Sequence, residues 1–381
     1  MVDGIPPMKI EICRPSELGR PELDRWRILQ DADPALASPF LCPEFTLAVG
    51  AVHARARVGV LFDGAQIVGF FPFERRGLGI GAPICAGHSN AQGLIGETGL
   101  EWDPRELLRA CGLAVWEFDH LVEGQTAFAP YETSRVPAPA MDLSAGFDQF
   151  SAHLRSRKSR FDALARKRRK LAREIGEERF VFTSDDVGAL RSVMRWKSDQ
   201  YARTGWSDRF ASPRTVELLE RLLDTRTDGF SGVLSMLWVG DQPIAGHFGL
   251  RSARVMAYWF PSYERRFGAY APGMIMNLSL AREAHAAGIE RVEMGPGGEE
   301  YKEWFGNRDL VVARGSVVRS TARGGLYRAT HSSMNYVHHV VLENPSLHGV
   351  ARRARARYVR AEAVFRRRSP TQLLSTSGGR S

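Results

Sequence analysis

The fold of this protein is decided by residues 232–304, which read GVLSMLWVGDQPIAGHFGLRSARVMAYWFPSYERRFGAYAPGMIMNLSLAREAHAAGIERVEMGPGGEEYKEW. Three apolar, strand-like segments come first, at 233–239, 244–250 and 255–260. A Pro-Gly pair at 272–273 then begins a helical pattern that ends at Gly288, and a further strand is expected at 291–295. Strands followed by a helix and another strand predict an α/β unit in which helices flank a mixed sheet.

The start of the expected helix suggests a binding site for an anion. Proline suits the first turn of a helix because its missing N–H is not needed there, and glycine lets a ligand approach the backbone closely. Free backbone N–H groups and the helix dipole then attract negative charge. The residues expected to hold the anion are Ala271, Pro272, Gly273 and Met274. A plain helix start is the alternative.

A glycine-rich turn follows the last expected strand and leads into polar residues, GPGGEEYKEW at 295–304. Loops at the carboxyl ends of strands are where ligand sites gather in α/β sheets. Glu299 or Glu300 could act as a general base, and Tyr301 could donate a proton to a leaving group. Lys302 could hold an anionic group. A solvated, charged turn is the alternative.

His247 is expected in the middle of a strand, on the same face as Ala245 and Gly249. These small neighbours leave room for a substrate over the ring, and a histidine can act as a base near neutral pH. His247 is therefore a further catalytic candidate. A core histidine whose hydrogen bonds are satisfied is the alternative.

The order of these segments resembles the GNAT acyltransferase superfamily. More narrowly, the chain resembles the CelD/BcsL group of cellulose-biosynthesis-associated proteins, which is related to the Fem-type aminoacyltransferases. The resemblance covers about residues 145–320, and its matching residues are Pro243–Gly246, Tyr270–Gly273 and Gly295–Trp304. It implies a tandem GNAT-like fold and an acyl-CoA donor, acetyl-CoA in the simplest case. The usual Arg/Gln-x-x-Gly-x-Gly/Ala loop of that superfamily is only approximated here, by RRFGA at 265–269.

The resemblance also points to residues that would contact the substrates. Lys197 and Tyr201 lie four residues apart on an expected helix, so they share one face, and the family places a similar Lys and Tyr beside its acceptor channel. Arg157 and Arg160 match the basic segment at the start of the family's domain. Surface packing is the alternative for all four residues.

The positive charge is concentrated in two segments. Residues 155–173 hold ten Lys and Arg against one acid, and residues 352–368 hold eight Arg against one acid, while the whole chain carries a net charge of +9. The rest of the chain is therefore acidic, which argues against a surface that binds nucleic acid generally. The first segment could steer a polyanionic substrate. The second could rest on an anionic membrane.

The length of 381 residues predicts two domains and the 44% of apolar residues a sizeable core. The expected divisions are a degenerate N-terminal GNAT-like domain at 1–140, an acetyltransferase domain at 141–323, and a basic helical extension with a disordered tail at 324–381. Four cysteines without CxxC spacing indicate a reducing compartment. No secretory signal pattern is seen, so a cytoplasmic protein is expected, with contact at the inner membrane as an option.

An internal repeat is suggested by two short segments. Ile67–Phe71 and Ile244–Phe248 share the pattern I-x-G-x-F, and each follows an apolar strand and a turn that contains Asp and Gly. A duplicated unit would explain the match, and so would chance.

The resemblance implies an enzyme that transfers an acyl group from acyl-CoA to an amine or hydroxyl of a sugar or an exopolysaccharide precursor. The link to an exopolysaccharide comes from the resemblance alone. Attack would be direct because residues 232–304 contain no cysteine, and no metal is required. One alternative is a Fem-like aminoacyltransferase that uses aminoacyl-tRNA. Another is a non-catalytic scaffold of a polysaccharide synthase at the membrane surface.

Overall fold

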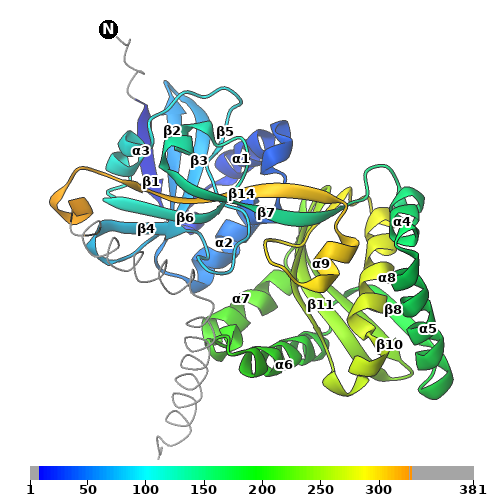
Figure 1. Cartoon of the computed structure of the whole chain (residues 1–381). Helices are drawn as coiled ribbons and strands as arrows, with labels where there is room; N and C mark the ends of the chain where they lie inside the picture. Colours follow the sequence, from blue (N-terminus) through cyan, green and yellow to red (C-terminus); the bar gives the residue numbers. More distant parts are fainter. Residues whose placement is uncertain (1–7, 326, 328–381) are drawn as a thin grey trace, which may run out of the picture.

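The computed structural model describes residues 8–325 and 327, and its elements fall into two halves (Figure 1). The first half contains β1 (Lys9–Cys13), α1 (Arg20–Ala32), α2 (Pro43–Val52), β2 (Ala56–Asp63), β3 (Gln66–Arg75), β4 (Ile80–Pro83), β5 (Ile95–Gly96), α3 (Pro104–Ala110), β6 (Val115–Leu121) and β7 (Glu132–Asp142).

The second half follows the same plan with longer helices. It contains α4 (Phe147–Ser156), α5 (Lys158–Glu174), β8 (Glu178–Ser184), α6 (Val187–Thr204), α7 (Pro213–Asp224), β9 (Arg226–Thr227), β10 (Phe230–Val239), β11 (Gln242–Ser252), β12 (Val255–Tyr263), α8 (Pro272–Ala286), β13 (Arg291–Glu293), α9 (Glu300–Phe305) and β14 (Arg308–Val318).

One mixed sheet runs through both halves, in the order β1-β2-β3-β4-β6-β14-β7-β13-β12-β11-β10-β8. Each strand of the first half has a counterpart in the second half that lies equally far from the opposite end of the sheet; β2 and β10, for example, are each second from an end. The last strands of the two halves are exchanged: β14 pairs with β6, and β7 pairs with β13. The two exchanged strands also pair with each other along the middle of the sheet. The duplicated unit is therefore present.

Matching glycines mark the repeat. Gly64 and Gly240 open equivalent hairpin turns with φ of 57° and 56°, and Gly112 and Gly288 end equivalent helices with φ of 64° and 80°. Both pairs keep the same spacing along the chain. The two I-x-G-x-F segments are one residue further apart along the chain than the glycines of each pair. The repeat is therefore real, but these two segments do not occupy equivalent positions in it. A shift of one residue turns every side chain of a strand to the opposite face.

Helices cover both faces of the sheet of the second half (Figure 1). α4, α5 and α8 pack on one face in one cluster of buried side chains, and α6 and α7 pack on the other. The cluster of buried side chains that contains α6 and α7 continues into the first half, where it includes α1 and α2. The indole of Trp259 lies at the junction, 5.2 Å from the ring of Phe40 and 6.2 Å from that of Phe45. The halves therefore share a core as well as a sheet.

The segment Val136–Ala140 reads VPAPA, a composition typical of a connector, but it lies within β7. Pro137 and Pro139 are two residues apart, and both fall outside the stretch of β7 that pairs with β13. On the β13 side of β7, no strand lies opposite these two prolines to accept hydrogen bonds, so their missing N–H groups do not break β7.

The helical sequence pattern at 147–175 forms two helices, α4 and α5, which are separated at Arg157 with φ −89° and ψ 55°. The expected boundary at 140/141 falls inside β7, and the three domain ranges stay predictions. The extension at 324–381, which includes Arg352–Arg368, lies almost wholly outside the described residues. Within the part of the chain that is described, no helix is long and apolar enough to span a bilayer.

We expect Gly315→Ala to destabilise the protein, because Gly315 lies where the exchanged strands cross. A Cβ there would lie 2.7 Å from Phe118 Cζ and 3.0 Å from Glu132 Cα. Overpacking of this kind costs about 1–3 kcal/mol, which urea unfolding would measure. Gly229→Ala is the control because no atom lies within 4 Å of its Cβ. Equal stability of the two variants would contradict the importance of this crossing.

Candidate active site

The candidate site lies where two parallel strands end. β12 and β13 pair in parallel over only three residues, so their carboxyl ends point to the same edge of the sheet. Gly295–Glu299 follows β13 there, and Pro261–Tyr263 ends β12. This is the place in an α/β sheet where polar loops can surround a ligand.

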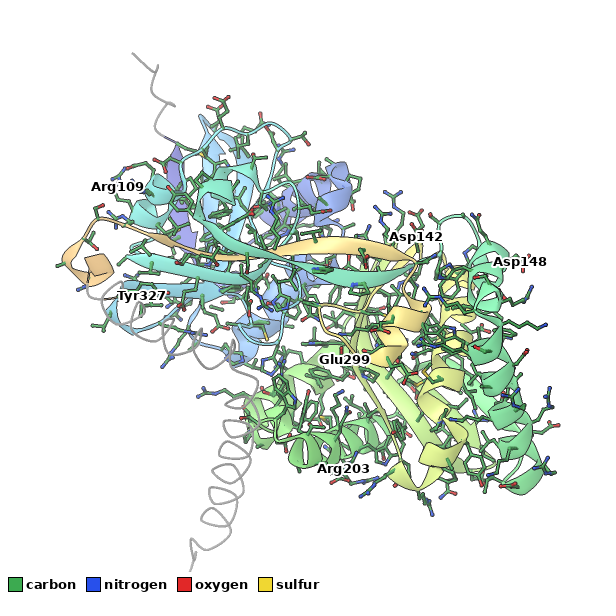
Figure 2. All side chains as sticks on the ribbon, in the orientation of Figure 1. Arg109, Asp142, Asp148, Arg203, Glu299 and Tyr327 are labelled. Atoms are coloured by element: carbon green, nitrogen blue, oxygen red, sulfur yellow. The ribbon has the colours of Figure 1, made fainter. Side chains whose placement is uncertain are left out.

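Among the polar residues predicted on the turn at 295–304, Lys302 is the most buried, with a residue exposure of 4%, whereas Glu299 (Figure 2) is exposed. Its Nζ donates to the carbonyl oxygen of Pro296 at 2.9 Å and pairs with Glu299 Oε2 at 2.9 Å. A Cβ at Gly297 would lie 2.9 Å from the same Nζ. The glycine-rich turn is therefore needed for the ammonium group to fit beneath it.

Lys197 reaches the same edge from α6. Its Nζ donates to the carbonyl oxygen of Pro261 at 3.1 Å. The pKa of Lys197 is lowered to about 8, mainly by burial; Glu299 opposes this shift, and Lys302 and Arg209 add to it. A lysine with this pKa is partly neutral near physiological pH and can accept a proton.

Tyr301 lies on α9 with its ring 6.0 Å from that of Tyr258. Burial raises the pKa of Tyr301 well above its usual value, and Glu299 raises it further. The phenol therefore stays protonated and can only act as a neutral hydrogen-bond donor. Glu299 and Glu300 are exposed at the start of the same helix, as a base that meets an incoming substrate would need to be.

The first half contributes to the site through the loop around Gly87 and His88. Arg209 donates to the carbonyl oxygen of Gly87, and Trp259 Nε1 donates to that of His88 at 2.8 Å. Burial first, and then the charge of Arg209, lower the pKa of His88 to about 4, so this ring is neutral. His88 and Arg209 lie far apart in sequence, and no spacing rule could have found them.

His247 lies in the core rather than at the site. It has an exposure of 0%, and its ring stacks on Tyr258 with centroids 4.3 Å apart. Nε2 accepts a hydrogen bond from the backbone N–H of Trp259 at 3.3 Å, and burial lowers the pKa of His247 to about 3. In this position the ring supports Tyr258 and does not meet a substrate.

The start of α8 is open. Ala271 adopts a left-handed conformation with φ 53° and ψ 52°, and no side chain caps the helix. A Cβ at Gly273 would have Tyr263 as its nearest neighbour at 3.7 Å. In the first half the equivalent helix, α3, begins later, and Asp103 accepts from the N–H of Arg105 at its start. A side-chain carboxylate thus accepts from a backbone N–H group at the start of α3, whereas no side chain does so at the start of α8.

The remaining predicted residues are spread around the site. Tyr201 lies beside Lys197, whose Nζ is 5.6 Å from the centre of its ring. Arg157 donates to the carbonyl oxygen of Glu303 on α9, and Arg160 is exposed on α5. The structure therefore brings Lys197, Tyr201, Glu299, Tyr301 and Lys302 together. Within the described residues, no group of three or more His, Cys, Asp and Glu side chains could hold a metal ion.

Comparison with known proteins agrees with this geometry. The family model described as an acetyltransferase (GNAT) domain matches residues 158–303. The chain carries a GNAT-type acyltransferase domain. The matched segment, residues 158–303, contains α6, α8 and the polar turn, and therefore most of the candidate site. An acyl-CoA donor is what this kind of domain generally implies. No curated protein matches the chain.

Solved structures extend the likeness to both halves of the chain. FemX has 9% sequence identity and a TM-score of 0.55, and the match covers 84% of this chain and 99% of FemX. A tandem GNAT protein from the clavulanic acid biosynthesis pathway has 11% identity and a TM-score of 0.47, with coverage of 83% and 99%. At 9% identity the likeness to FemX is one of fold. The α/β, tandem GNAT-like architecture expected from the sequence is confirmed.

We expect the shifted pKa of Lys197 to make stability depend on pH. Its folded value of about 8 lies below the usual 10.5, so between these pH values the unfolded chain binds more protons. Stability should therefore rise with pH in this window, by about 3 kcal/mol in all. Lys197→Met should remove this rise in urea unfolding, whereas Lys167→Met, an exposed control on α5, should keep it. The same rise in both variants would contradict the assignment.

Proposed function

We propose that the protein moves an acyl group, acetyl in the simplest case, from acyl-CoA to an amine or hydroxyl of a sugar or another cell-envelope precursor. The observation that carries the proposal is the group of Lys197, Tyr301 and Lys302 at the carboxyl ends of β12 and β13, inside a GNAT-type domain. The family by itself implies acyl transfer. The acceptor class is the further step.

The reaction would begin with attack of the acceptor nitrogen or oxygen on the thioester carbonyl carbon. The new bond to carbon forms first and gives a tetrahedral oxyanion, the nucleophile loses a proton, and the C–S bond then breaks to release CoA as a thiolate. The neutral fraction of Lys197 can take that proton directly. Glu299 or Glu300, both exposed, can accept it in turn or serve as the base themselves.

Negative charge develops first on the carbonyl oxygen and then on the leaving sulfur. The ammonium group of Lys302 is fixed by Pro296 and Glu299 and can stabilise the first of these charges without reorganising. The protonated phenol of Tyr301 can donate a hydrogen bond to the second. These two roles need the geometry seen at the turn.

A covalent acyl-enzyme is not part of the proposal. The chain has four cysteines, and none lies within residues 158–303. Burial raises the pKa of each of the four thiols. A thiol with a raised pKa is a poor nucleophile. Direct attack by the acceptor is therefore the simpler path.

The basic helix α5 suits an anionic donor. Its C-terminal end lies beside the start of α8, where Tyr270 donates to Glu174 Oε2 at 3.1 Å and Lys170 Nζ lies 5.5 Å from the centre of the Tyr270 ring. The phosphates of CoA would meet both the open N–H groups of α8 and this positive field. Contact with an anionic membrane through Arg352–Arg368 remains a separate proposal, on residues outside those described.

A second candidate is a Fem-like aminoacyltransferase that uses aminoacyl-tRNA. It is favoured by the fold that the chain shares with FemX across both halves and by the exposed cations of α5. Binding of tRNA that weakens steeply with salt, together with no affinity for CoA, would support it.

The deciding experiment is isothermal titration of the protein with acetyl-CoA and with CoA. Micromolar binding of either would support an acyl-CoA donor. No binding at millimolar concentrations would overturn it and favour the aminoacyl-tRNA donor. A titration with tRNA at two salt concentrations would then test that alternative.

We expect Tyr301→Phe and Glu300→Gln to lower turnover more than they weaken binding of the donor. Loss of one proton-transfer or hydrogen-bonding group typically costs about 10²-fold or more in rate. Steady-state kinetics and donor titration would measure both effects. Glu303→Gln is the control because this exposed acid lies on the same helix. Unchanged rates in both test variants would remove the turn from the mechanism.

We expect Gly273→Val to weaken binding of the donor at the start of α8. A branched side chain there would cover the free N–H groups that a phosphate needs. The space beside Gly273 accepts a Cβ, with its nearest neighbour at 3.7 Å, so the variant should fold. Gly229→Val, on an open turn, is the control. Wild-type affinity of a folded Gly273→Val protein would show that the donor binds elsewhere.

A further inference from the structure

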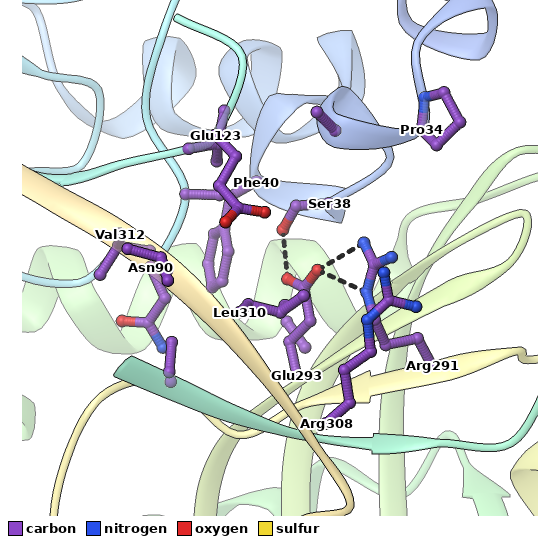
Figure 3. A pocket seen from close by; sticks show the side chains of 17 residues that line it. Pro34, Ser38, Phe40, Asn90, Glu123, Arg291, Glu293, Arg308, Leu310 and Val312 are labelled. Atoms are coloured by element: carbon purple, nitrogen blue, oxygen red, sulfur yellow. Dashed lines mark hydrogen bonds and ion pairs between the residues drawn. The ribbon is translucent and has the colours of Figure 1, made fainter. Parts of the chain in front are cut away.

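A cavity of about 180 Å³ lies between the two halves, next to the candidate site. Its roof is the segment of the first half that includes Ser38 and Phe40, and its floor comes from β7, β12, β13 and β14 (Figure 3). Because residues from both halves form its walls, the cavity exists only in the assembled protein.

The inner end of the cavity is a fixed polar group. Glu293 accepts from Ser38 Oγ at 2.8 Å through one oxygen, and from Arg291 Nε and Nη2 at 3.1 and 2.9 Å through the other. The side chains of Arg291 and Glu293 are each 15% exposed. Side chains held in this way can present hydrogen-bonding groups in a set direction.

The outer part of the cavity carries two polar side chains that make no hydrogen bond or ion pair with other described residues, Asn90 and the exposed Glu123 (Figure 3). Arg308 also lines it but pairs with Asp142 at 3.2 Å. Both arginines of the cavity are thus paired with carboxylates, whereas the charge of Glu123 is met only at longer range, by Arg135, whose pKa it helps to raise. This favours a ligand with an amino group and hydroxyls over a phosphate or a carboxylate.

The size and floor of the cavity limit the ligand further. The cavity volume of about 180 Å³ is well above the ~10–15 Å³ that one water molecule needs, which leaves room for a small ligand such as one monosaccharide. Ala138 and Ala257 form a flat floor of small side chains, and Phe40 adds an apolar wall. An apolar surface with a few convergent polar groups is the usual character of a ligand site.

The cavity and the candidate site share one wall. Gly295 lines the cavity, and a Cβ there would lie 3.1 Å from Asn90 Nδ2. Two residues further along the same turn, a Cβ at Gly297 would lie 2.9 Å from Lys302 Nζ. Two residues span at most about 7 Å. A sugar in the cavity would therefore lie against the turn that carries the reacting groups.

We propose that this cavity binds an amino-sugar residue of the acceptor, with Glu123 pairing with its amino group and Asn90 and Glu293 with its hydroxyls. That the sugar is the acceptor of the acyl group rests on the proposed function. That a sugar binds here rests on the cavity alone. Glu123 is a positioning residue in this scheme and does not touch the acyl group.

Saturation-transfer NMR and isothermal titration of the full chain with glucosamine, glucose and glucosamine 6-phosphate would test the proposal. We expect glucosamine to bind most tightly. Glu123→Gln should weaken glucosamine binding about ten-fold and leave glucose unchanged, because only the charge pair is lost. Glu101→Gln, an exposed acid outside the cavity, should match the wild type.

Ala138→Leu would fill the floor of the cavity and should abolish binding of every sugar while acetyl-CoA still binds. Binding of glucosamine that neither Glu123→Gln nor Ala138→Leu changes would overturn the proposal, and so would tighter binding of the phosphate. Acetyl-CoA titration keeps the two conclusions separate. Donor binding without sugar binding would sink only the cavity assignment, and sugar binding without donor binding would sink only the proposed function.

Discussion

The exchange of two strands is the constraint on which the rest of the structure depends. β7 leaves the first half to pair with β13, and β14 returns to pair with β6. Neither half can complete its own sheet, because the edge of each is covered by a strand of the other. Open edges with unpaired N–H and C=O groups are costly and prone to association, so the exchange joins the halves more firmly than a surface contact would. Every feature of the candidate site that needs both halves follows from this.

A shared core then fixes how loops of the first half lie over the second. Trp259 packs against Phe40 and Phe45 and donates to the carbonyl oxygen of His88. The loop around His88 is thereby held beside α6 and the polar turn. The same packing places the roof of the cavity over β13, where Ser38 meets Glu293. Site and cavity are thus two results of one interface, built on rigid strands rather than on free loops.

The two lysines of the site differ in how their charges are compensated. Lys302 has a carboxylate partner and a carbonyl acceptor, which compensate the cost of removing its charge from water. The pKa of Lys197 falls because burial outweighs the opposing charge of Glu299, and because Lys302 and Arg209 add to the shift. One lysine is suited to hold negative charge and the other to exchange a proton. Their sequence neighbours do not reveal this difference.

The sequence by itself determined the α/β plan and the strands and helix of residues 232–304, because hydrophobic period and turn residues are local properties. It offered Lys197 only as an acceptor contact, and the lowered pKa that lets this lysine exchange a proton came from the structure. Only the tertiary structure decided that VPAPA is a strand, that His247 is buried, and that Arg209, His88 and Asn90 lie near the turn. Those outcomes depend on strand exchange and on packing between halves distant in sequence. A strand that contains prolines is tolerated only where no neighbouring strand needs the missing N–H groups. A histidine can be catalytic only where solvent or substrate can reach it. Both outcomes therefore depend on how the sheet is assembled.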